Sequence, residues 1–252
     1  MTQSAVRSRV NECTPDPSVV FDRKVAELHV RYARMVVARG YIHNTLGNIA
    51  IRVRHPNYPD GVLYTKPSGL SLEEVMPEDL VVTDVIDGRL LQGAVPTSVG
   101  HQLNREIMRL RLGVNAVIHV HDDATIALLA SGVMDDLRGV SLEFPYVMCK
   151  PPHVVPSHLD VEEDVSSIRE FIQDTNSLVM KRHGITTLGR TISEAYHRLN
   201  TITSEIRRMI MVAQLSKTCG TTPEYLSQAE MDWMYERGEK VIYPNFEKDR
   251  QG

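Results

Sequence analysis

Apolar positions follow two different periods along the chain, and together they predict a mixture of helices and strands. From Val25 to Val36, apolar residues recur at three- and four-residue spacing, and Gly40 follows as a stop signal. This pattern predicts a helix over 19–39 with one buried face. The segment 193–217 repeats the pattern over a greater length, which predicts a second long helix.

Short runs of apolar residues between turn-rich pieces predict a set of strands. These runs are 48–53, 62–65, 80–85, 114–118 and 178–180, and 140–149 is also expected to be extended. Further helices are expected at 100–111, 122–132, 160–174 and 228–238. The chain therefore belongs to the α/β class. Residues 1–18 are mostly polar and are expected to form a flexible arm, with 19–252 as a single domain.

Composition and charge narrow the classes of partner. The 252 residues, 42% of them hydrophobic, can bury one large core. A net charge of −4 without a long basic run argues against nucleic acid and anionic membranes as partners. No run approaches the roughly 18 to 20 apolar residues of a membrane span. Three distant cysteines favour neither disulfides nor a cysteine zinc site, so we expect a cytoplasmic protein.

The segment His119-Val120-His121 carries the strongest chemical signal. It ends a predicted strand, and side chains two residues apart on a strand point to the same face. The two imidazoles can therefore bind one metal ion. His183 also follows an apolar run and offers a third imidazole. Three neutral imidazoles with open coordination positions are typical of a catalytic metal site.

Six short motifs occur in an order that resembles a known family. They are Gly47-Asn48, Pro67-Ser68-Gly69, Pro77-Glu78-Asp79, Pro96-Thr97-Ser98, His119-Val120-His121 and Arg182-His183-Gly184. The chain resembles the class II aldolase/adducin family, whose enzymes include fuculose-phosphate aldolase, ribulose-phosphate 4-epimerase and several decarboxylases. The resemblance implies a three-layer fold, with a central, mostly antiparallel β-sheet flanked by helices, and a homotetramer.

The resemblance also assigns residues to a metal and to an anion. His119, His121 and His183 would hold one divalent ion, which could be Zn, Mn, Fe or Co. The anion of a small-molecule oxyacid substrate, either phosphate or carboxylate, would be bound by polar side chains and by the backbone at a glycine. The matching positions are Asn48, Lys66, Ser68, Gly69, Thr97 and Ser98.

One position departs from the family pattern. In the family's aldolases, an acid/base glutamate lies about 19 residues before the first metal histidine, and counting back from His119 reaches Gly100. Glu106 lies six residues further on and matches a different family position. Because an imidazole can move protons near pH 7, we expect His101 to take over the acid/base role.

This departure shapes the expected function. We expect a divalent-metal-dependent lyase that cleaves a carbon–carbon bond of a hydroxylated acid, and we favour decarboxylation because the glutamate is missing. One alternative is a non-heme Fe(II) oxygenase acting on a hydroxyaryl-pyruvate or related oxyacid. A second is a sugar-phosphate aldolase or epimerase. An adducin-like module without activity is disfavoured because all three metal ligands are present.

Overall fold

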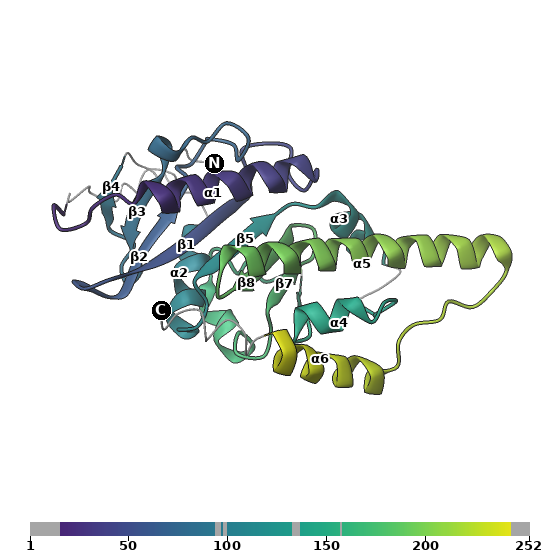
Figure 1. Ribbon diagram of the computed structural model, residues 1–252. Helices are drawn as coiled ribbons and strands as arrows, with labels where there is room; N and C mark the ends of the chain where they lie inside the picture. The colour runs from purple at the N-terminus through teal and green to yellow at the C-terminus, as the bar shows by residue number, and fades with distance from the viewer. Residues whose placement is uncertain (1–15, 94–96, 98–99, 133–136, 157, 243–252) are drawn as a thin grey trace.

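A single sheet forms the centre of the computed structural model, which describes residues 16–93, 97, 100–132, 137–156 and 158–242 (Figure 1). Within this part of the chain the strands are β1 (Asn48–His55), β2 (Tyr58–Thr65), β3 (Val81–Asp84), β4 (Leu90–Gln92), β5 (Ala116–Val120), β6 (His153–Val155), β7 (Ser177–Met180) and β8 (Gly184–Gly189). Their order is β4-β3-β2-β1-β5-β8-β7-β6. Of the strand pairs described, β6 with β7 is parallel and the others are antiparallel, which confirms the expected mostly antiparallel sheet.

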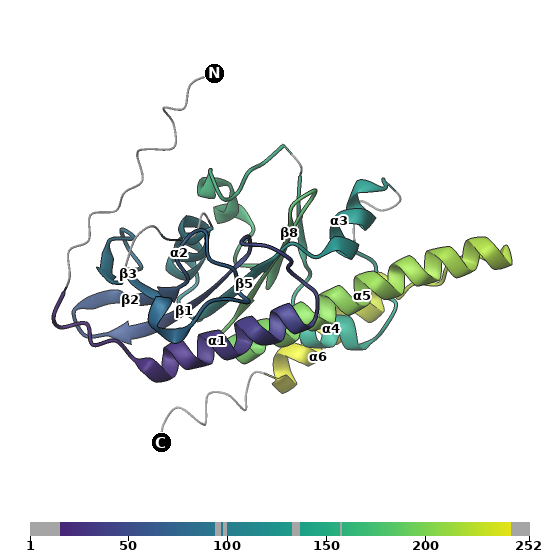
Figure 2. The same ribbon diagram turned by 90° about the horizontal axis from the view of Figure 1, so that it is seen from above.

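Helices cover both faces of the sheet (Figures 1 and 2). They are α1 (Arg23–Ala38), α2 (His101–Leu110), α3 (Asp123–Ala130), α4 (Glu143–Met148), α5 (Ile192–Cys219) and α6 (Gln228–Ile242), with 3-10 helices η1 (Pro77–Asp79) and η2 (Val165–Glu170). On one face, apolar residues of α1 and α5 pack against Ile49 and Ile118. On the other face, α2 and η2 pack against Val117 and Leu188. Successive side chains along a strand thus point into two different cores, one on each face of the sheet. The expected three-layer fold is confirmed.

Two of the expected elements are wrong. The segment 140–149 is not extended, because Glu143–Met148 forms α4, with Phe144, Pro145 and Met148 buried. A short apolar run has no period that separates a buried helix from a buried strand. The expected helix over 160–174 is reduced to η2, because the Asp160 and Asp164 side chains accept backbone N–H groups two or three residues further on and form turns instead.

The long helix α5 extends beyond the rest of the molecule at its C-terminal end (Figure 2). Met211 and Leu215 on this part are 52% and 63% exposed. The expected homo-oligomer stays a prediction, as does the boundary of the N-terminal arm. Among the described helices, none is both long enough and apolar enough to cross a lipid bilayer.

A buried histidine joins α1 to the sheet. His29 has no exposed surface, and its Nε2 lies 2.9 Å from the Ile49 carbonyl oxygen of β1. Burial lowers the pKa of His29 to about 4. The side chain is therefore neutral at pH 7. It also stays neutral just below pH 6.5, where an imidazole in water becomes protonated.

We expect this histidine to destabilise the fold in acid. Because the pKa is lower in the folded state, the unfolded chain binds more protons between pH 6.5 and pH 4, and the free energy of unfolding falls as the pH falls through this range. A change from 6.5 to about 4 corresponds to roughly 3 kcal/mol. Urea unfolding of wild type and His29→Gln at several pH values measures the contribution, since glutamine can donate to Ile49 but does not titrate. Parallel pH dependence in the two proteins would contradict it.

Candidate metal centre

Two imidazoles of the site are positioned by β5. His119 is 2% exposed, and its Nδ1 lies 3.0 Å from the Thr186 hydroxyl oxygen on the neighbouring strand β8. His121 follows the end of β5 on the same face, and its Nε2 lies 2.9 Å from Nε2 of His119. The Thr186 contact orients the His119 ring, so that its other nitrogen faces His121. Such support of a ligand's second nitrogen is common in metal sites.

The third imidazole comes from the turn between β7 and β8. A Cβ at Gly184 would lie 2.0 Å from the Val120 carbonyl oxygen and 3.2 Å from Cα of His121. Only glycine allows the β8 backbone to approach the end of β5 so closely. This approach brings His183 beside His121, and the three ring centroids are 4.8 to 5.0 Å apart. The structure thus brings together the three histidines predicted from the sequence.

The cluster has the chemistry of a metal site. Burial, and then the neighbouring His183, lowers the pKa of His121 to about 4, and the pKa of His119 is also depressed, mainly by burial. The rings are therefore neutral at pH 7, the form that binds metal. Metal–nitrogen bonds of about 2.1 Å place adjacent ligand nitrogens roughly 3 Å apart. Nε2 of His121 lies 2.9 Å from Nε2 of His119, and the ligand nitrogens of all three histidines lie within 4.8 Å of one another, so the group could hold one cation.

The three histidines line a cavity of about 350 Å³. The other residues around it come mainly from the turn before β1, the loop after β2 and the segment around residue 162. They are Thr45, Leu46, Gly47, Asn48, Lys66, Ser68, Gly69, Gly100 and Glu162. Asn48, Lys66, Ser68 and Gly69, which the resemblance assigned to an anion, thus lie in the same cavity as the histidines.

Lys66 is the cation among these predicted anion ligands. Its side chain is 1% exposed, and its Nζ donates to the Thr45 carbonyl oxygen at 3.0 Å. Burial lowers the pKa of Lys66 to about 8, so most of the side chain remains charged at pH 7. Thr97 pairs with Pro67 through a single β-bridge and is not among the cavity residues. Ser98 lies outside the described residues.

The structure does not bring His101 to the cavity. His101 is 5% exposed, and its Nε2 lies 2.7 Å from the Thr83 hydroxyl oxygen. Burial lowers its pKa to about 3. Gly100 lines the cavity, and the next residue of a helix points about 100° away from it. Glu106 is also elsewhere, because it pairs with Arg109 and Arg169 at 3.0 and 2.8 Å.

The sequence analysis missed Glu162, the carboxylate in this cavity. Its Oε2 lies 3.6 Å from Nε2 of His183, and the residue is 9% exposed. Burial, and then the charge of Asp160, raises the pKa of Glu162 to about 7. No motif marks this position. The residue lies in an acidic segment that reads as a solvated surface, and only the folding of that segment carries Glu162 inward.

The fold and the cluster define an α/β protein with three layers and a three-histidine site at the ends of central strands. The chain belongs to the class II aldolase and adducin N-terminal domain family, whose model matches residues 27–208. It is 30% identical over 168 residues to an L-fuculose phosphate aldolase of Methanococcus maripaludis, covering 66% of this chain and 86% of that protein. It is 26% identical over 212 residues to a 5-deoxy-D-ribulose 1-phosphate aldolase of Bacillus thuringiensis, covering 83% and 93%.

The fold is also similar to solved structures. An aldolase II superfamily protein from Pseudomonas syringae has a TM-score of 0.71 at 18% identity, covering 94% of this chain and 92% of that one. At this level of identity, the similarity concerns the fold alone.

Proposed function

We propose that this protein is a divalent-metal-dependent lyase of the aldolase type, which cleaves a carbon–carbon bond of a small phosphorylated hydroxyketone. The observation that carries the proposal is one cavity that contains both three neutral imidazoles and a buried lysine. A metal ion held by His119, His121 and His183 would supply a Lewis acid that polarises the substrate carbonyl.

The second part of the proposal concerns the substrate. The relatives named above act, by their names, on sugar phosphates, which favours phosphate over carboxylate as the anion. In the sequence alone, the glycine at position 100 favours decarboxylation, because the family's aldolases have a glutamate there. Glu162 supplies a carboxylate to the cavity, so that argument no longer separates decarboxylation from aldol cleavage. Aldol cleavage is therefore the better supported proposal.

The direct test is cleavage of ketose 1-phosphates. Metal-free protein is reconstituted separately with Zn, Mn, Fe(II) or Co, and mixed with L-fuculose 1-phosphate or 5-deoxy-D-ribulose 1-phosphate. We expect an aldehyde and dihydroxyacetone phosphate to be released with at least one metal. Failure to cleave either compound with any metal would contradict the proposal. Release of CO₂ from a hydroxy acid would support the decarboxylase instead, and oxygen uptake with Fe(II) would support the oxygenase.

Replacing Lys66 should weaken the binding of the substrate phosphate. A hydrogen bond to a charged group contributes about 1.5 to 3 kcal/mol, so Lys66→Met is expected to raise KM by roughly 10- to 150-fold with a smaller effect on kcat. Steady-state kinetics measures both constants. The control is Lys24→Met on the exposed side of α1, which should leave KM unchanged. An unchanged KM in Lys66→Met would exclude this lysine as an anion ligand.

A further inference from the structure

Position 100 has no side chain, although its backbone could carry one. Gly100 has φ −70° and ψ 4°, values that any residue can adopt. A Cβ built there would lie 2.6 Å from Oε1 of Glu162 and 2.5 Å from Nδ2 of Asn48. Backbone geometry therefore does not explain the glycine at this position. The space beside it does, because the ends of two other side chains already fill that space.

The segment around Glu162 is built to direct its side chain into this space. The Asp160 side chain accepts the backbone N–H groups of residues 162 and 163 at 3.0 and 3.3 Å, which forms a tight turn. Val161 is 1% exposed and packs in the core between the sheet and α2. With Val161 anchored, Glu162 reaches the cavity wall next to His183, where its Oε2 lies 3.6 Å from the imidazole.

We propose that Glu162 is the proton-transferring carboxylate of this site, delivered by the turn at 160–164, and that Gly100 leaves the room for it. Gly100 stands at the position of the family pattern's glutamate, and the carboxylate of Glu162 occupies the space beside it. The inference rests on the proposed function. Geometry selects Glu162 over His101, which is buried against Thr83 away from the cavity.

Atoms and electrons balance when Glu162 acts in this way during cleavage of a ketose 1-phosphate. Glu162 accepts the proton of the C4 hydroxyl group. The bond between C3 and C4 breaks, and its electron pair moves to C3. C4 becomes the aldehyde carbon, and Glu162 returns the proton that it accepted to C3, so that the products are an aldehyde and dihydroxyacetone phosphate and the carboxylate is regenerated. No oxidant or reductant is needed.

The first test is Glu162→Gln, which keeps the size of the side chain and removes the carboxylate. Loss of a positioned acid/base group costs about 10²- to 10⁴-fold, so kcat is expected to fall at least 100-fold. Metal content and Tm are expected to match the wild type. The control is Glu163→Gln, an exposed neighbour outside the cavity, which should keep wild-type kcat.

The second test moves the carboxylate back to position 100. Gly100→Glu alone should lower Tm by about 5 °C, because two carboxylates would compete for one space. Combined with Glu162→Ala, the same substitution should be tolerated and should raise kcat at least tenfold above Glu162→Ala. The matched control is Gly100→Gln with Glu162→Ala, which has the same size but no carboxylate and should recover no activity.

The outcomes separate this assignment from the proposed function. If Glu162→Gln keeps kcat within about threefold of wild type, or loses metal together with activity, Glu162 is not the proton-transferring group, while the lyase proposal stands. Equal Tm changes for Gly100→Glu with and without Glu162 would show that the two positions do not share a space, which also overturns the assignment. If the wild type cleaves no ketose 1-phosphate with any metal, the proposed function fails and this assignment fails with it.

Discussion

His119→Ala is expected to abolish stoichiometric metal binding and nearly all activity. Removing a group that only supports a metal ligand costs 10- to 100-fold in affinity, so removing a ligand should cost at least about 100-fold. A Lewis acid contributes several kcal/mol to the transition state, and each 1.36 kcal/mol is tenfold in rate. We therefore expect kcat/KM to fall by about 10³-fold or more.

Metal analysis of dialysed protein and steady-state kinetics after reconstitution measure the two effects. The control is His158→Ala, an exposed histidine outside the cavity, which should keep both metal and activity. Because His119 is 2% exposed, the variant's folding has to be checked by circular dichroism without metal. A folded His119→Ala protein that binds one metal ion with wild-type affinity would show that the three-imidazole site is wrongly assigned.

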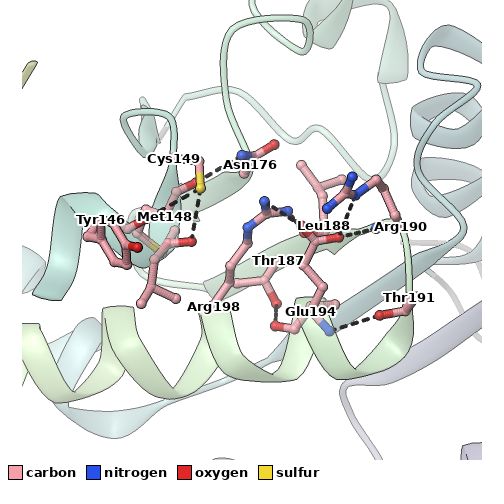
Figure 3. A network of polar contacts seen from close by, with 12 residues as sticks. Tyr146, Met148, Cys149, Asn176, Thr187, Leu188, Arg190, Thr191, Glu194 and Arg198 are labelled. Carbon is pink, nitrogen blue, oxygen red and sulfur yellow. Dashed lines mark hydrogen bonds and ion pairs between the residues drawn. The ribbon is translucent and has the colours of Figure 1, made fainter. Parts of the chain in front are cut away.

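Glu194→Ala is expected to cause a large loss of stability. Glu194 and Arg198 lie one turn apart on α5, 8% and 2% exposed, beside the end of β8 (Figure 3). The Glu194 carboxylate accepts from Arg198 Nη2 at 2.8 Å and from the Arg190 backbone N–H at 2.6 Å. Arg198 also donates to the Leu188 carbonyl oxygen at 2.6 Å. This network therefore attaches α5 to the strand whose other end leads to His183.

Removing one partner of a buried ion pair typically costs 3 to 5 kcal/mol, because the other charge stays in a poorly solvated place. At about 2 to 4 °C per kcal/mol for a chain of this size, Tm should fall by roughly 6 to 20 °C. The matched control is Glu27→Ala. Glu27 pairs with Arg23 at the same helical spacing and at 2.9 Å, but both side chains are more than half exposed. An exposed pair contributes about 1 kcal/mol or less. Equal Tm shifts in the two variants would contradict the argument from burial.

Periodicity and motif order allowed the long elements and the three clustered histidines to be predicted. α1 and α5 bury one face over several turns, and this repeats often enough to be read from a single sequence. His119 and His121 share a face because of strand geometry, which needs no tertiary information. His183 was predicted from the apolar run that precedes it and from the order of the motifs. The physical cause of its position, the close contact between Gly184 and the end of β5, becomes visible only in the folded chain.

The remaining features depend on contacts between distant segments. α4 is too short to show a helical period, and its packing against α5 and α6 is a tertiary property. His101 and Gly100 are neighbours in sequence, but rotation about the α2 axis turns the histidine toward Thr83. Glu162 was missed because residues that are distant in sequence can be adjacent in space. It is distant in sequence from Gly100, although its carboxylate lies beside that residue, and a search along the chain for a carboxylate near residue 100 cannot find it.

The pairing of β5 with β8 leaves no room for a shift in register between these two strands. His119 lies opposite Thr186, and the adjoining pairs place Ile118 and Ile185 in the core beneath α1 and α5. A slip of one residue along either strand would turn every side chain to the other face. Such a slip would move the His119 imidazole into the apolar core and an isoleucine side chain into the cavity. The alignment of these two strands is therefore required both for burial of the isoleucines and for placement of the imidazoles. A misaligned sheet would lose stability as well as the site.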